Sequence, residues 1–216
     1  MTAQRRPPHL DTISGTIDLE LPEFDAPPSD PFAVLRDWVA AAVRVGVAEP
    51  FAVSLATADA HGRPSNRTVL AKSLDASGLL FVSSGGSAKG SELAANPYAA
   101  ALMYWKETRQ QLRLSGRVTP IAAAESDAMF AARPIAAQAS AVASHQSEPL
   151  ADPAGLRAEA DSLAAAGLAL TRPADWGGYL LRPDTIEFWH GSVDRLHRRL
   201  RYELTPAGWT HTRLYP

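Results

Sequence analysis

The sequence predicts an α+β fold that is mainly β, arranged as a closed or nearly closed antiparallel barrel with flanking helices. About eight short runs of alternating apolar residues are separated by brief turn signals, which is typical of such barrels. The helical patterns do not alternate with these runs as βαβ units would. No internal repeat is present.

The amino-terminal part predicts an arm followed by one domain. Residues 1–28 are polar and rich in proline, so we expect a flexible or extended arm there, with a single domain over 29–216. Asp30 and Pro31 form a helix start, and apolar residues recur at helical spacing until Gly46.

The next stretch predicts a strand over 51–57, then two strands joined by a tight turn. The first of the two carries Arg67, the turn lies at 75–78 and the second strand follows at 79–83. Ser87 then caps a helix with Lys89 in its first turn. A helix amino terminus with Lys89 and a nearby Arg67 suits a phosphate, although an ordinary strand-loop-helix corner has the same pattern.

The rest of the chain alternates between strand pairs and an alanine-rich helical region. The expected strands lie at 98–106, 110–118, near 179–181, at 185–190 and on both sides of 206–208. The expected helices begin at Thr119-Pro120, Pro134 and Asp152-Pro153.

Composition excludes several classes of function. The 216 residues are 46% hydrophobic and 20% charged, with a net charge of −2 and no cysteine. Disulfides, thiol nucleophiles and thiolate metal sites are therefore excluded, and the charge argues against a nucleic-acid partner. No window approaches the roughly 18 apolar residues of a membrane span, and the first fifteen residues lack a signal-peptide core, so we expect a cytoplasmic location without a membrane partner.

The segment 195–201 is unusually basic. A strand with a period of two would place Arg195, His197, Arg199 and Arg201 on one face, where they repel each other unless anions or carboxylates lie opposite. A solvated basic edge strand is the alternative. Just before it, Trp189 would be either a core residue or the wall of a pocket for a planar ligand.

Taken together, these elements resemble the pyridoxamine 5′-phosphate oxidase-like family of flavin-dependent split barrels. The resemblance covers residues 31–216. It rests on the following segments: 67–72, Ser87-Ala88-Lys89, Gln111, Arg133-Pro134, Gln146-Ser147, 186–189 and Arg195-Leu196-His197 with Arg199.

The resemblance implies an FMN-binding split β-barrel, antiparallel and Greek-key-like, with FMN at the interface of a homodimer. The residues implied to bind FMN are Arg67, Thr68, Val69, Leu70, Lys72, Val82, Ser83, Ser87, Lys89, Gln111, Gln146, Ser147, Trp189 and Arg199. The implied substrate positions are Lys72, Met129, Arg133, Ala137, Arg195 and His197. No metal is implied.

Two departures bear on the substrate. The family's vitamin oxidases hold a substrate phosphate with a lysine, a tyrosine, an arginine and a serine, but here Met129 and Ala137 stand at the tyrosine and serine positions. Each missing bond to a charged group is worth about 1.5 to 3 kcal/mol. Ala88 also replaces a family arginine beside Lys89. With the segment 21–31, these changes resemble the phenazine-biosynthesis branch.

That branch implies an oxidase that transfers a hydride from a reduced phenazine carboxylate, a small anionic aromatic substrate, to FMN, with O2 as the terminal acceptor. Arg195 would anchor a carboxylate and His197 would accept a proton. The alternatives are a pyridoxamine or pyridoxine 5′-phosphate oxidase, a nicotinamide-dependent split-barrel reductase, and a non-enzymatic barrel that binds flavin or haem.

Overall fold

The structure is a computed structural model that describes residues 13–216. Its helices are η1 (Pro22–Phe24), α1 (Pro31–Arg44), α2 (Ala88–Ala95), α3 (Ala123–Ala131), α4 (Ile135–Ala143) and α5 (Pro153–Ala165). Its strands are β1 (Ala52–Ala58), β2 (Pro64–Leu70), β3 (Ser73–Asp75), β4 (Gly78–Ser84), β5 (Tyr98–Trp105), β6 (Gln110–Pro120), β7 (Trp176–His190), β8 (Arg198–Thr205) and β9 (Gly208–Leu214). None of the helices within 13–216 is long and apolar enough to cross a membrane.

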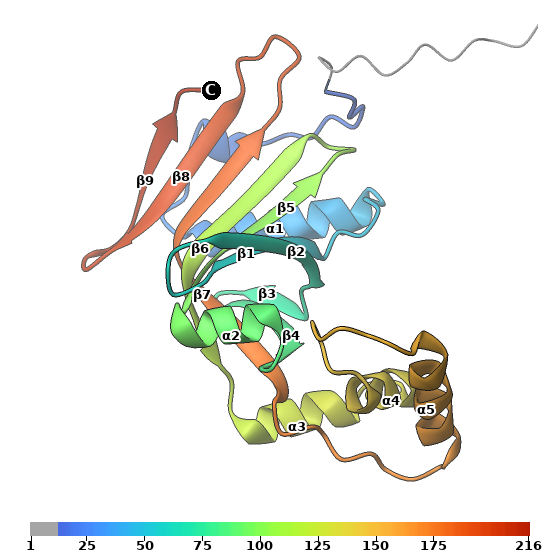
Figure 1. Cartoon of the computed structure of the whole chain (residues 1–216). Coiled ribbons are helices and arrows are strands. Elements are labelled where there is room, and N and C mark those ends of the chain that lie inside the picture. Colours follow the sequence, from blue (N-terminus) through green and yellow to red (C-terminus); the bar gives the residue numbers. More distant parts are fainter. Residues whose placement is uncertain (1–12) are drawn as a thin grey trace, which may run out of the picture. The chain divides into compact units, whose positions relative to one another are not determined.

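The strands follow the order β2-β1-β5-β6-β7-β4-β3, and β8 pairs with both β7 and β9 (Figure 1). The pairs β1–β2, β3–β4, β4–β7, β7–β8 and β8–β9 are all antiparallel. The α+β, mainly antiparallel prediction is therefore confirmed.

The chain forms two compact units. The first unit consists of Met1–Pro50, Leu102–Leu114 and Thr185–Pro216, of which residues 13 onward are described. The second unit consists of Phe51–Ala101 and Ser115–Asp184. Strands β5, β6 and β7 each contribute residues to both units.

The first unit has an aromatic core around α1. The Asp30 side chain accepts a bond from the Phe32 amide and caps the helix, as the sequence predicts. The Trp38 ring packs edge-on against Phe188 at 5.0 Å, and Phe188 in turn meets Tyr202 at 6.0 Å. Ring pairs at these distances prefer such tilted arrangements.

The described part of the predicted arm, residues 13–28, packs within the first unit. The Ile17 amide donates to the Glu107 carbonyl at 3.0 Å, and Phe24 is only 3% exposed. The Tyr202 hydroxyl donates to the Pro28 carbonyl at 2.9 Å. Apolar side chains spaced between the prolines allow this packing. Residues 1–12 of the predicted arm lie outside the described residues.

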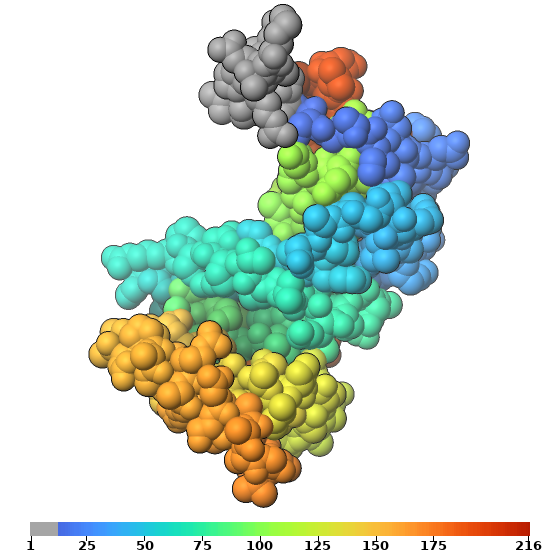
Figure 2. Space-filling view, turned by 90° about the vertical axis from the view of Figure 1, so that its right-hand side faces the viewer, coloured from blue at the N-terminus to red at the C-terminus, as the bar shows by residue number. Residues whose placement is uncertain are grey.

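The second unit combines short strands with helices α2 to α5. Leu55, Leu79, Phe81 and Leu181 are completely buried in its core. Figure 1 shows α4 and α5 running close to each other in this unit. The same segment, coloured yellow to orange, presents a broad exposed surface in the lower part of Figure 2.

Three sequence predictions about elements are wrong. The strand with Arg67 pairs with β1, and the tight turn at 75–78 instead joins the separate short strand β3 to β4. The chain leaves β2 because the Lys72 amide donates to the Leu80 carbonyl at 2.7 Å. The strands expected near 179–181 and at 185–190 are one continuous strand, β7. Strand β6 continues to Pro120, so α3 begins only at Ala123.

Candidate functional site

The amino terminus of α2 forms a cradle of polar groups in the second unit. The Ser87 hydroxyl accepts a bond from the Gly90 amide at 3.2 Å and donates to the Ser84 carbonyl at 2.7 Å. A Cβ on Gly90 would lie 2.4 Å from the Gly85 carbonyl oxygen. The glycine therefore lets the first turn of α2 approach the 84–85 backbone and fixes where Lys89 points.

Lys89 is a half-buried cation with neutral partners. Its Nζ donates to the Ser87 hydroxyl at 3.0 Å and to the Gln146 side-chain oxygen at 3.1 Å. Burial lowers the pKa of Lys89 from its usual value, and the positive charge of Arg67 lowers it further, whereas Glu92 acts in the opposite direction. A cation that is desolvated next to another cation favours an anionic ligand.

Arg67 lies on β2 and is linked to Glu92 of α2. Its guanidinium contacts a Glu92 carboxylate oxygen at 3.0 Å and donates to the hydroxyls of Thr57 and Ser65. Burial raises the pKa of Glu92, but the hydrogen bonds from Thr57, Ser65 and Arg67 outweigh burial and hold that pKa below its usual value. Glu92 therefore stays ionised and orients Arg67.

Two further serines complete the group. The Ala88 amide, the first of α2, donates to the Ser147 hydroxyl at 3.1 Å, and Ser147 has a φ of 75°. The Ser83 hydroxyl lies 3.2 Å from the Ser87 hydroxyl. We call Arg67, Ser83, Ser87, Lys89 and Ser147 the anion cradle. Its two cations, the Ser147 hydroxyl and the helix amino terminus form a donor set that fits a phosphate monoester such as that of FMN, while the Ser83 and Ser87 hydroxyls donate to the Ser84 carbonyl.

Other predicted cofactor residues of the second unit lie differently. Along β2 the half-buried face carries Arg67 and Val69, while Thr68 and Leu70 occupy the exposed face. Lys72 follows the end of β2 and is exposed, so Arg67 and Lys72 do not lie on one continuous strand. Val82 is half-buried on β4.

In the first unit, the carboxylate of Glu187 gathers the basic side chains of β6 and β8. Glu187 is 2% exposed and contacts Arg199 at 2.8 Å, Arg201 at 3.1 Å and Arg113 at 3.5 Å. We call these four residues the glutamate cluster. The predicted shared face of Arg199 and Arg201 is thus present, and the carboxylate opposite it is Glu187.

Arg195 and His197 do not lie on that strand face, so their predicted alternation with Arg199 is wrong. Strand β8 begins at Arg198, and Arg195 is exposed in the preceding loop with a φ of 69°. Asp194 holds this loop by accepting from the Leu196 amide at 2.9 Å and from the Ser192 hydroxyl. Asn, Asp and similar residues commonly divert a chain in this way.

The loop nevertheless brings His197 against Trp189. Their rings lie 4.8 Å apart, and the Ser192 amide donates to His197 Nδ1 at 3.0 Å. With Nδ1 accepting, the neutral ring carries its hydrogen on Nε2 and donates from there. Gln111 is half-buried on β6 of the same unit.

The predicted substrate residues of the second unit line different cavities. Met129 lines a cavity of about 610 Å³ with Ser73 and Leu80. Arg133 lines a separate cavity of about 370 Å³ beside Trp176. Ala137 is half-buried on α4, four residues after Arg133.

Sequence reasoning missed two carboxylates that order the cradle. The local signal for Glu92 is its spacing, because it follows Lys89 by three residues in α2 and so shares its face. Asp175 accepts from the Ser84 hydroxyl and from the Gly86 amide at 3.3 Å, which fixes the loop before α2. Asp175 is 91 residues from Ser84, and no local pattern indicates that contact.

Two family models match the chain. Residues 39–165 match the pyridoxamine 5′-phosphate oxidase model, and residues 176–216 match the model of the pyridoxine 5′-phosphate oxidase C-terminal dimerisation region.

Similar proteins carry two kinds of name. A dihydrophenazinedicarboxylate synthase from Burkholderia lata is 43% identical over 96% of this chain and 98% of its own length. A pyridoxine/pyridoxamine 5′-phosphate oxidase from Nitrobacter hamburgensis is 47% identical over 87% of this chain and 90% of its own. The crystal structure of PhzG from Burkholderia lata 383 in complex with tetrahydrophenazine-1-carboxylic acid has a TM-score of 0.90 at 44% identity, covering 94% of this chain and 100% of that one.

These matches confirm the family that the sequence motifs indicate, over both the segment that carries the anion cradle and the segment that carries the glutamate cluster. The chain belongs to the pyridoxamine 5′-phosphate oxidase family of flavin-dependent oxidases.

Proposed function

We propose that the protein is an FMN-dependent oxidase of phenazine biosynthesis that oxidises reduced phenazine carboxylates, with O2 as the terminal electron acceptor. One observation carries the choice of substrate: the similarity, at a TM-score of 0.90, to a structure that holds tetrahydrophenazine-1-carboxylic acid. The two relatives named dihydrophenazinedicarboxylate synthase support it, since they align with 96% and 95% of this chain.

The anion cradle supports FMN as the flavin. Lys89 and Arg67 offer two cations to the phosphate, and the Ser147 hydroxyl, which accepts from the Ala88 amide, keeps its own hydrogen as a donor. The Ser83 and Ser87 hydroxyls both donate to the Ser84 carbonyl and order the loop before α2. Gln146 is oriented by Lys89 and would hold the polar chain of the cofactor. A flavin held by these residues would supply a two-electron acceptor for the hydride of the substrate, and O2 would take the two electrons, with two protons, as hydrogen peroxide.

The first unit supplies groups suited to a planar anionic substrate. Trp189 offers an aromatic wall, and His197, in the tautomer fixed by Ser192, donates a hydrogen bond from Nε2. We therefore assign His197 to holding a substrate carboxylate rather than to accepting a proton at that atom. Arg195 is exposed at the tip of the same loop and would pair with that carboxylate.

The dimerisation region matched by residues 176–216 supports a homodimer. We propose that FMN lies at the interface of its two subunits. Leu70 on β2 is 51% exposed in the single chain, and Thr68 lies on the same exposed face. Burial of this face against a second copy would bring both residues to the cofactor.

A vitamin B6 oxidase is the second candidate. It is favoured by relatives of 43% to 47% identity that carry the name pyridoxine/pyridoxamine 5′-phosphate oxidase. Met129 and Ala137 argue against it because neither side chain donates a hydrogen bond to a phosphate.

The experiment is anaerobic mixing of the flavin-loaded protein with a freshly reduced phenazine carboxylate and, separately, with pyridoxine 5′-phosphate. We expect the flavin absorbance near its visible maximum to bleach rapidly with the phenazine and slowly or not at all with the vitamin. Rapid bleaching by pyridoxine 5′-phosphate with none by the phenazine would overturn the assignment.

A variant pair tests the substrate loop in the same assay. Arg195→Gln should raise the phenazine concentration needed for half-maximal bleaching while FMN stays bound, since Arg195 lies outside the anion cradle. Arg36→Gln, an exposed position on α1, is the matched control and should behave as wild type. Unchanged kinetics in Arg195→Gln would remove this residue from the site.

A further inference from the structure

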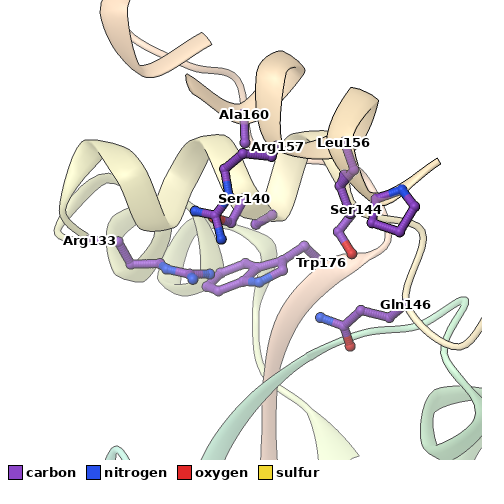
Figure 3. Close-up of a pocket in the computed structure, with 10 residues that line it drawn as sticks. Arg133, Ser140, Ser144, Gln146, Leu156, Arg157, Ala160 and Trp176 are labelled. Atoms are coloured by element: carbon purple, nitrogen blue, oxygen red, sulfur yellow. The ribbon is translucent and has the colours of Figure 1, made fainter. Parts of the chain in front are cut away.

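A cavity of about 370 Å³ lies between α4, α5 and the start of β7 in the second unit. Figure 3 shows that Arg133, which precedes α4, and Arg157 of α5 both direct their guanidinium groups toward the Trp176 ring. Ser140 and Ser144 also line the cavity, and the Ser140 hydroxyl donates to the Ala136 carbonyl at 2.8 Å. Two cations therefore converge on one concave space.

Neither guanidinium has an anionic partner within the described chain. Across residues 13–216, no carboxylate forms an ion pair with Arg133 or Arg157. The Arg133 guanidinium instead lies 5.0 Å from the centre of the Trp176 ring, and Trp176 is 3% exposed. Stacking on an indole positions a guanidinium while its N–H edge remains available to a carboxylate.

Much of the remaining cavity lining is apolar. It consists of Pro153, Leu156 and Ala160 of α5, together with Ala141 of α4. Helix α5 has 13 residues, none of which is fully buried. A helix that covers a cavity without filling it leaves apolar surface that a flat ligand body would cover.

We propose that this cavity binds one carboxylate end of the planar aromatic substrate and that Arg157 is a substrate-binding residue with Arg133. This deepens the proposed function and rests on it, because the phenazine assignment selects a carboxylate over other organic anions. The cavity also reaches Gln146, whose side-chain oxygen bonds to Lys89 of the anion cradle at 3.1 Å. The Gln146 side chain would thus lie between the substrate carboxylate and Lys89, the residue that would hold the cofactor phosphate.

Binding of a phenazine dicarboxylate, which offers one carboxylate to His197 and Arg195 and the other to this cavity, tests the inference without any turnover when it is measured by calorimetry on the flavin-loaded protein. Arg157→Gln should weaken binding about ten- to a hundredfold, the loss expected for one charge-assisted hydrogen bond. Arg157→Lys should recover part of the affinity. Arg63→Gln, an exposed arginine of the β1–β2 turn, is the matched control and should bind as wild type.

Two further ligands, one neutral and one phosphorylated, test whether Arg157 recognises a carboxylate in particular. The phenazine dicarboxamide, the neutral counterpart, should bind equally to wild type and Arg157→Gln. An Arg157→Gln loss for pyridoxine 5′-phosphate as large as that for the carboxylate would contradict the inference, as would unchanged affinity for the carboxylate. A wild type that binds the carboxylate through Arg157 but never bleaches with reduced phenazines would refute the proposed function alone.

Discussion

The anion cradle of the second unit and the glutamate cluster of the first unit use similar basic side chains for different ends. In the glutamate cluster, three arginines surround the buried carboxylate of Glu187. In the anion cradle, Glu92 pairs with Arg67, but Lys89 bonds only to a hydroxyl and an amide. In the glutamate cluster every arginine has a carboxylate partner, whereas in the anion cradle Lys89 is a half-buried cation that contacts none.

This difference separates cations that have a carboxylate partner from Lys89, the cation that we propose binds the cofactor phosphate. When one partner of a buried ion pair is removed, the folded protein loses much stability, because the other charge remains desolvated. A half-buried cation without a carboxylate contributes little to the fold and gains a partner when an anion binds. Loss of the Glu187 carboxylate should therefore lower mainly the stability of the fold. Loss of the Lys89 charge should lower mainly the affinity for the cofactor.

The largest effect should follow from Glu187→Ala in the glutamate cluster. Removal of this carboxylate leaves Arg199 without its carboxylate partner and Arg201 with only the exposed Glu203, so we expect a loss of about 3 kcal/mol in the free energy of unfolding. Denaturant titration at a fixed protein concentration measures it. Glu203→Ala is the control: Glu203 is 60% exposed and 3.8 Å from Arg201, so its loss should change stability by less than about 1 kcal/mol. Equal effects of the two variants would show that burial does not distinguish them.

A second test distorts the anion cradle through its backbone. In Gly90→Ala, the new Cβ would lie 2.4 Å from the Gly85 carbonyl oxygen, which forces α2 away from the loop. We expect a stability loss of about 1 to 3 kcal/mol, typical of overpacking, together with weaker FMN binding. Ser91→Ala, at the next and exposed position, should leave both quantities near wild type. Retention of full FMN affinity in Gly90→Ala would mean that the first turn of α2 does not position the ligand donors.

A smaller effect is expected from pH. Burial and Arg67 lower the pKa of Lys89 from 10.5, so the folded protein releases this proton at a lower pH than the unfolded chain. Below the pKa that Lys89 has in the folded protein, burial of its ammonium destabilises the fold. This destabilisation is relieved as pH rises through that pKa. FMN affinity should change in the opposite sense, falling as Lys89 loses its charge in the window below 10.5.

FMN titrations at stepwise alkaline pH measure this dependence. Lys89→Met should flatten the decrease because it removes the titrating group. An identical decrease in wild type and Lys89→Met would assign the pH dependence to another residue.

Local sequence chemistry predicted the starts of α1 and α2 well, but not that of α3, which begins at Ala123 rather than after Thr119-Pro120. Asp30 caps α1 and Ser87 caps α2 through their own side chains, so the signal and the structure involve the same few residues. The end of β2 was not predictable in this way. It depends on the Ala71 amide pairing with Phe51 and the Lys72 amide pairing with Leu80, which are tertiary contacts.

The candidate site shows the same division. Period-two alternation correctly placed Arg199 and Arg201 opposite a carboxylate, but failed at Arg195, where the side chain of Asp194 diverts the backbone into a loop. The local pattern indicated Arg67, Ser87 and Lys89 as groups suited to a phosphate, whereas Ser83 and Ser147 of the anion cradle came from the family resemblance. Arg157 and Asp175 had no sequence signal because their contacts are defined only by packing between distant segments.

The most direct test of the central claim, that the anion cradle binds the cofactor phosphate, compares FMN with riboflavin, which lacks that phosphate. In titrations of the flavin-free protein, wild type should bind FMN about ten- to a hundredfold more tightly than riboflavin. Lys89→Met should lose about tenfold of that preference, while Lys106→Met, at an exposed lysine of the first unit, should keep it. An undiminished preference for FMN in Lys89→Met would contradict the claim.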